Sequence, residues 1–141
     1  MGVKRCLTFS LVVLLVAAAA CSVSLSTANI SSVKVGKDKA ITQEANAFGA
    51  QDVVYAAATI SNNPGKVKVK GTLVIEDVAG EKPGPIPGAE ASVDLPGSGT
   101  ATFNFSPPAN GWPAGKYKLE VVMLNEEGAQ KDQKSASFTV S

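Results

Sequence analysis

The residue with the most distinctive chemistry in this chain of 141 residues is Cys21. Four alanines at positions 17–20 precede it, an apolar run covers Leu7–Val16, and the chain starts with the basic residues Lys4 and Arg5. A basic start, a short apolar core and small residues before a cleavage point are typical of a secretory signal peptide. We therefore expect residues 1–20 to be removed, which would leave the thiol of Cys21 at a new N-terminus where it can be acylated.

The segment Ala18-Ala19-Ala20-Cys21 resembles the lipobox of bacterial lipoproteins. The resemblance implies that Cys21 carries a diacylglycerol on its sulfur, often with a further acyl chain on its amine, and several acyl chains anchor a protein stably. The sequence departs from the family at Ala18, where leucine is usual. Ala18-x-Ala20 also fits an ordinary signal-peptidase site, which would release a soluble protein with a free Cys21. Ser22 follows the cysteine in place of aspartate, which implies the outer membrane if the source is Gram-negative.

Composition narrows the possible functions of the mature chain. The other cysteine, Cys6, lies in the removed segment, so the mature chain has a single thiol and cannot form an internal disulfide. Removal of residues 1–20 also takes Lys4 and Arg5 away, which leaves 11 basic against 12 acidic residues and a net charge of −1. A near-neutral domain has no general attraction to nucleic acid, so we expect no nucleic-acid partner.

Catalytic chemistry has few candidates in this sequence. The chain has no histidine, which is the commonest general base and metal ligand, and it has no nucleophile elbow, phosphate-binding loop or zinc motif. Glu76 and Asp77 are neighbours on a predicted strand and therefore point to opposite faces. Asn125-Glu126-Glu127 offers oxygen ligands, but hard cations need about six to eight, usually from several segments. We predict no catalytic residue, no metal site and no cofactor, and we expect that the protein is not an enzyme.

A row of lysines is the first candidate interaction surface. Lys66, Lys68 and Lys70 alternate along one predicted strand, so their side chains share a face. One interpretation is a solvated face or a charged strand edge that blocks unwanted pairing. The other is a contact with anionic headgroups or an anionic partner, to which each nearby lysine adds about 1 kcal/mol.

Two further segments also allow a structural and a functional interpretation. The segment Lys82–Gly88 has prolines at alternate positions around Ile86, which predicts a stiff, extended loop. Such a loop either connects the two sheets or presents an exposed Ile86 to a partner. Trp112 could stack on a sugar, but a position in the core or against a loop is the more ordinary role of a lone tryptophan.

From Ile30 onward, apolar and polar residues alternate with a period of two, which is typical of strands with one buried face. Turns rich in Gly, Pro and Asn separate these segments and favour an all-β sandwich over residues 30–141 behind a polar tether at 21–29. The predicted strands are Ile30–Val35, Val53–Ile60, Lys66–Glu76, Ala89–Leu95, Thr100–Phe105, Lys116–Leu124 and Ser135–Val140.

The segment Trp112-Pro113-Ala114-Gly115-Lys116-Tyr117 resembles the W-P-x-G-x-Y start of the penultimate strand in many bacterial immunoglobulin-like domains. Tyr117 also matches the tyrosine corner, in which a tyrosine hydroxyl bonds back to the backbone. The resemblance covers residues 47–141 and implies an immunoglobulin-like or fibronectin-III-like antiparallel sandwich of seven strands. It implies no particular activity, because such sandwiches have many unrelated roles.

These observations predict a non-enzymatic domain of the cell envelope, anchored by lipid, that binds or scaffolds a partner protein. The expected partners are the membrane, through the N-terminal lipid, and an envelope protein. Two alternatives stay open. One is a structural subunit in which an edge strand such as Ile30–Val35 or Ser135–Val140 pairs with another chain. The other is a carbohydrate-binding accessory domain that uses Trp112.

Overall fold

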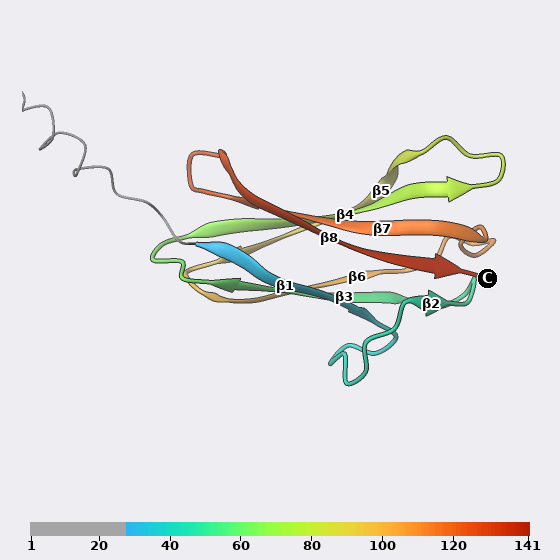
Figure 1. Ribbon diagram of the computed structural model, residues 1–141, viewed down its shortest axis with the longest axis horizontal. Coiled ribbons are helices and arrows are strands. Elements are labelled where there is room, and N and C mark those ends of the chain that lie inside the picture. Colours follow the sequence, from blue (N-terminus) through green and yellow to red (C-terminus); the bar gives the residue numbers. More distant parts are fainter. Residues whose placement is uncertain (1–27) are drawn as a thin grey trace, which may run out of the picture.

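The computed structural model describes residues 28–141. The predicted signal peptide and Cys21 lie outside this part of the chain. Eight strands form two face-to-face sheets (Figure 1), which confirms the predicted all-β, immunoglobulin-like sandwich. The strands are β1 (Asn29–Gly36), β2 (Ala47–Phe48), β3 (Val54–Ser61), β4 (Val67–Val78), β5 (Gly84–Leu95), β6 (Gly99–Phe105), β7 (Gly115–Leu124) and β8 (Gln130–Val140).

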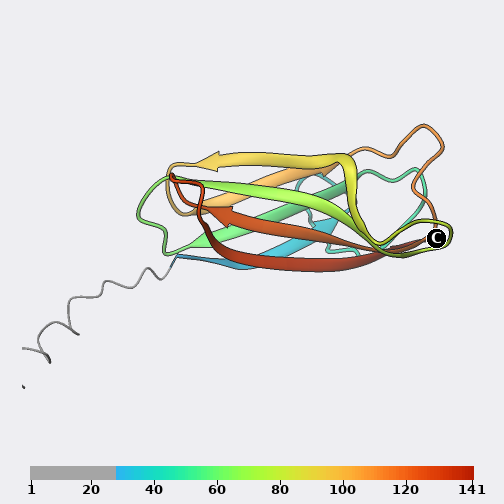
Figure 2. The same ribbon diagram turned by 90° about the horizontal axis from the view of Figure 1, so that it is seen from above.

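The two sheets differ in width. One has the strand order β1-β3-β6 and the other the order β2-β8-β7-β4-β5. Neighbouring strands are antiparallel except for the short β2, which runs parallel to the end of β8. Seen from above, β8 and β5 lie on opposite sides of the wider sheet (Figure 2). In a constant-type immunoglobulin domain four strands face three, whereas here three strands face five because β5 pairs with β4 and the short β2 pairs with β8.

The observed strand bounds correct several sequence predictions. β8 begins at Gln130 and not at Ser135. β5 begins at Gly84 and not at Ala89, because Gly84 and Pro85 pair with β4 before a bulge between Thr72 and Val74. Asn29, which was assigned to the tether, is the first residue of β1. β2 was not predicted, since a strand of two residues is too short to show a period.

The core lies between the two layers and follows the predicted alternation. Along β7 the side chains of Tyr117, Leu119, Val121 and Met123 are at most 1% exposed, and the residues between them are half-buried. The same alternation runs along β3. No polar or charged residue among 28–141 is buried. No helix in this range is long and apolar enough to cross a membrane.

Candidate functional site

Trp112 and Tyr117 fix the segment that leads from β6 into β7. The Tyr117 hydroxyl donates a 2.6 Å hydrogen bond to the carbonyl of Pro113, which is the geometry of a tyrosine corner. Burial, and then the negative charge of Glu81, raise the pKa of Tyr117. Gly115 between them has φ 153°, and a Cβ there would overlap the carbonyl oxygen of Asp77, so glycine is required.

The structure places Trp112 in the core. Its side chain is 6% exposed, its ring contacts Tyr117 edge to face, and its Nε1 donates a 2.9 Å hydrogen bond to the carbonyl of Asp52. Its backbone N–H donates to the carbonyl of Ala50. A buried indole has no open ring face for a sugar, so Trp112 has the more ordinary of the two roles and holds the loop between β2 and β3.

That loop contains a polar residue that sequence reasoning missed. The Asp52 carboxylate accepts a 2.7 Å hydrogen bond from the backbone N–H of Gly49 and lies 3.5 Å from the Lys37 Nζ. The Gly49 hydrogen bond is the largest cause that holds the pKa of Asp52 below its ordinary value; burial opposes it, and the positive charge of Lys37 lowers the pKa further. Asp52 therefore stabilises the connection that brings β2 against β8. A single aspartate in a turn carries no sequence signal for this role.

The row of Lys66, Lys68 and Lys70 does not protect a strand edge. β4 lies between β7 and β5, so the prediction of a charged strand edge is wrong, whereas Lys66 and Lys68 are exposed as a solvated face requires. The Lys70 Nζ lies 3.1 Å from Glu90 on β5, and Lys68 is the register partner of Asp94. The lysines therefore alternate with acids on the neighbouring strand, which weakens the attraction that a uniformly basic face would have for anionic headgroups.

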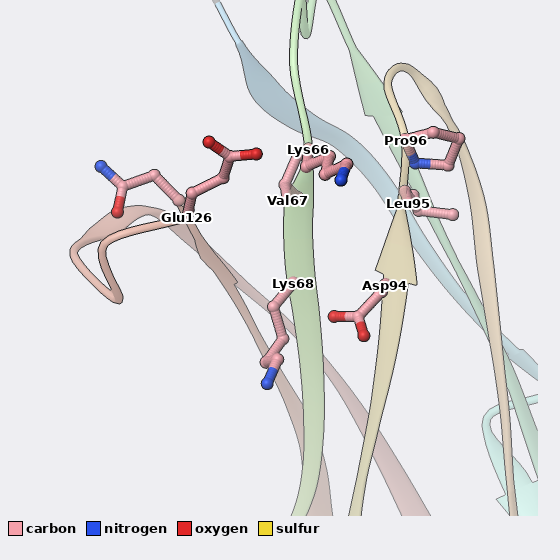
Figure 3. A pocket seen from close by; sticks show the side chains of 8 residues that line it. Lys66, Val67, Lys68, Asp94, Leu95, Pro96 and Glu126 are labelled. Atoms are coloured by element: carbon pink, nitrogen blue, oxygen red, sulfur yellow. The ribbon is translucent and has the colours of Figure 1, made fainter.

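A shallow groove of about 540 Å³ surrounds the first two lysines (Figure 3). It lies between the end of β5 and the turn from β7 to β8, and Ala28 lines an adjoining groove. The groove therefore lies at the end of the sandwich where the described chain begins. Apolar side chains and charged side chains of both signs line this groove, so it favours neither an anionic nor a cationic ligand. The lining residues are Lys66, Val67, Lys68, Asp94, Leu95, Pro96, Asn125 and Glu126.

A second groove, of about 380 Å³, opens between β5 and β6 at the opposite end. Ile86 lines it on the β5 side, half-buried and packed against the core. The segment Lys82–Gly88 is therefore not a loop between the sheets, because β4 and β5 form a hairpin within one sheet. Most of the residues lining this groove are apolar, including Ile86, Pro87, Ala89, Ala91, Phe105, Pro108 and Trp112.

The two sides of the sandwich differ in how their edge strands are covered. On the side of β1, the N–H of Ile30 donates a 2.8 Å hydrogen bond to Oδ2 of Asp132 on β8, and the N–H of Ala45 donates a 2.9 Å bond to the carbonyl of Val35. On the opposite side, no hydrogen bond joins β5 to β6 anywhere in residues 28–141. In the same residues no three acidic, cysteine or histidine side chains lie together as a metal site would require.

Solved structures align with this chain at low sequence identity. A Niemann-Pick type C2 protein from the Japanese carpenter ant aligns with a TM-score of 0.51 at 14% identity, over 81% of this chain and 92% of its own. The soluble domain of PmoD from a Methylocystis species aligns with a TM-score of 0.45 at 16% identity, over 77% and 89%. A CARDB domain from Pyrococcus furiosus, solved with di-metal ions, aligns with a TM-score of 0.39 at 13% identity, over 84% and 97%. No protein-family model and no curated protein matches the sequence. At 14% identity, the likeness to the Niemann-Pick type C2 protein concerns the fold alone.

Proposed function

We propose that this protein is a non-enzymatic binding module, anchored in the cell envelope by lipid on Cys21, that holds a partner protein at the side of the sandwich between β5 and β6. The observation that carries the proposal is the apolar groove on that side, where no hydrogen bond closes the gap between the two edge strands among the described residues. The fold supports it, because sandwiches of this kind serve as frames for many binding surfaces.

The register of the strands relates the groove to the expected anchor. Asn29 pairs with Ser61 at one end of β1, and Val54 pairs with Phe105 at the other end of β3. The groove beside Phe105 therefore lies at the end away from Ala28. A tether from Cys21 to Ala28 spans at most about 25–30 Å when extended. A lipid on Cys21 would therefore keep the domain close to the membrane and leave the groove facing away from it.

The anchor is tested by Cys21→Ser. We expect a folded domain that moves to the soluble fraction, or an uncleaved precursor that stays in the membrane through residues 1–20. Mass spectrometry of the wild-type N-terminal peptide should find acyl chains on Cys21. An unmodified Cys21 at the mature N-terminus would show that an ordinary signal peptidase releases the protein.

The binding role is tested by purifying the tagged full chain from detergent-solubilised native envelopes. We expect one envelope protein to be enriched reproducibly, and we expect Ile86→Glu to reduce that enrichment at least about tenfold, because it brings a carboxylate into the apolar groove. Gln133→Glu is the matched control, since it adds the same charge at an exposed position on β8. Thermal unfolding of both variants checks the fold. Equal enrichment by both variants, or no reproducible partner, contradicts the proposal.

The two alternative functions have less support. Pairing of another chain along Ile30–Val35 would have to displace the hydrogen bonds that Ile30 and Val35 already make. On β8, pairing at Thr139 and Val140 would compete with β2. A carbohydrate site at Trp112 would require an exposed ring, and this ring is buried.

A further inference from the structure

We propose that β6 is the acceptor strand for a single extended segment of the partner protein, which lies beside β6 and opposite β5 and so adds a fourth strand to the narrow sheet. This inference rests on the proposed function and names the way in which the partner binds. Strand addition uses the unpaired backbone groups of a sheet edge for affinity and alternate side chains for specificity.

Edge strands in soluble proteins are protected by charges, prolines, bulges or covering segments. β5 has Pro85 and Pro87, a bulge in its pairing with β4, and the acids Glu90 and Asp94. The edge of β1 has a bulge near Ile30 and the covering hydrogen bonds described above. The open part of β8 has the sequence Gln-Lys-Asp-Gln-Lys at its start. Three of the four edges therefore show protection.

β6 differs from these edges in every respect. Its seven residues, Gly99–Phe105, include no charge and no proline, and it pairs with β3 without a shift in register. Its solvent face consists of Thr100, Thr102 and Asn104, and its other face is buried. A regular, uncharged edge is the kind that accepts another strand.

The wide sheet extends beyond β6 by one strand. A Cβ built on Gly71 of β4 would lie 3.3 Å from the Phe103 ring, so β6 lies opposite β4. Ala91 on β5 is the register partner of Gly71, so the inner face of β5 lies opposite the empty position beside β6. Val69 and Leu73 on β4 are 0% exposed, whereas Ala91, Val93 and Leu95 on β5 are only partly buried. Of these three side chains, Ala91 lines the groove, and a strand beside the Phe105 end of β6 would cover it.

The same overhang excludes an intact second copy that pairs antiparallel with β6. If two copies paired through β6 around a two-fold axis, each β5 would occupy the position of the other copy's β4, because β4 lies opposite β6 and β5 lies opposite the added strand. A single extended segment has no second sheet and fits the space. In the constant-type immunoglobulin arrangement the corresponding place is held by an edge strand of the four-stranded sheet.

The groove specifies the chemistry of the segment. Its inward side chains would be apolar, since they enter the groove of about 380 Å³ lined by Ile86, Ala89 and Phe105. Its outward side chains would be uncharged, with Ser or Thr favoured opposite Thr102, because such cross-strand pairs stabilise a sheet. Proline would be absent from its middle, since it removes a donor from the ladder.

A photo-crosslinking amino acid placed in turn at positions 100, 102 and 104 of the full chain, in the native envelope, tests the geometry. These side chains are exposed, so the replacement does not disturb the core. We expect the three positions to crosslink to one continuous partner segment, at points that advance in regular steps of two residues, because alternate residues of a strand share a face. Crosslinks without this order, or to scattered segments, overturn the strand-addition proposal even if a partner is bound.

The matched variants Ala91→Phe and Ser92→Phe separate strand addition from binding elsewhere. Ala91→Phe fills the space opposite β5 where the inward side chains of the segment would lie, whereas Ser92→Phe adds the same ring to the exposed face of β5. We expect the crosslink at position 102 to fall at least about tenfold in Ala91→Phe and to persist in Ser92→Phe. Unfolding temperature checks that Ala91→Phe is folded. Partner enrichment with an unchanged crosslink in Ala91→Phe overturns this inference and leaves the proposed function standing, whereas loss of all enrichment in the wild type overturns both.

Discussion

The side of the sandwich formed by β1 and β8 and the side formed by β5 and β6 have strands of similar length but different closure. The first is joined across the sheets by the carboxylate of Asp132 and continued by β2, whose Phe48 packs edge to face on Phe138 at 5.2 Å. On the second side the turn of residues 96–98 connects β5 to β6, no hydrogen bond joins these two strands among the described residues, and an apolar groove opens at the other end. A few side chains and short segments outside the regular strands therefore close the side of the sandwich formed by β1 and β8.

Closure also determines which edge can bind. A covered edge must lose native hydrogen bonds before it accepts a partner, and such bonds are each worth about 0.5–1.5 kcal/mol. An uncovered edge loses none. The uncharged β6 therefore offers the lower cost of strand addition, and the overhanging β5 restricts access to a single segment.

The largest expected effect comes from Phe48→Ala on the closed side. Phe48 is 2% exposed, and truncation of a buried phenylalanine costs about 3–5 kcal/mol. Ile86→Ala on the open side should cost only about 1 kcal/mol, because the half-buried isoleucine loses less contact. Chemical denaturation of both variants measures the difference in unfolding free energy. Equal costs would show that the open side contributes as much to the core as the closed side.

A smaller effect is expected from Asp132→Ala. The substitution leaves the N–H of Ile30, which now donates a 2.8 Å hydrogen bond to the carboxylate, without its partner. Loss of such a partly buried bond costs about 1–2 kcal/mol. Asp94→Ala removes an exposed acid of the open side and should change stability by less than about 0.5 kcal/mol. Hydrogen exchange at the Ile30 amide should become faster in Asp132→Ala and stay unchanged in Asp94→Ala. An unchanged exchange rate in Asp132→Ala would show that Asp132 does not protect this edge of β1.

Features that depend on residues close together in the sequence could be predicted, whereas contacts between distant residues could not. The alternation along β7 and the spacing from Pro113 to Tyr117 are local, so the strand and its corner could be predicted. The Asp132 bond to Ile30 joins residues 102 apart, and only the folded topology reveals it. The central place of β4 likewise depends on pairing order, which the alternation of its lysines does not encode.

The proline segment around Ile86 shows a different limit. Alternate prolines predict an extended backbone, and both a stiff loop and an edge strand are extended. The structure has the edge strand, where a missing N–H is tolerated because it faces away from the ladder. The choice between the two depended on the bulge that lets Pro85 pair with Val74, which no pattern in β5 indicates.

Tyr117→Phe should lower the unfolding free energy by about 1 kcal/mol. Tyr117 lies on β7, which is not an edge strand, so this variant measures a hydrogen bond that belongs to neither side of the sandwich. The variant keeps the ring stacked on Phe138 and loses the hydrogen bond to Pro113. The folded-state pKa of Tyr117 is raised above 10.0 by burial and then by Glu81. Its contribution is therefore fully present below pH 10.0 and is lost as the pH rises through the folded-state value. Denaturation at neutral and alkaline pH should show the gap between wild type and variant narrowing only above pH 10.0, and a constant gap contradicts this account.

The smallest expected effect is the change in unfolding free energy at acid pH that Asp52 causes on the side formed by β1 and β8. The hydrogen bond from Gly49, followed by the charge of Lys37, holds the folded-state pKa of Asp52 below 3.8. A lowered pKa stabilises the folded state at pH values above the unfolded-state pKa, and this contribution is lost as the pH falls through the folded-state pKa.

Asp52→Asn keeps an acceptor oxygen but no charge, so wild type should be slightly more stable at neutral pH and the difference should vanish in acid. Lys37→Gln should keep part of this acid dependence, because the hydrogen bond from Gly49 is the largest single cause of the lowered pKa. If Lys37→Gln abolishes it, the ion pair and not the turn holds β2 in place. Acid titrations of the unfolding free energy for the three proteins decide between these outcomes.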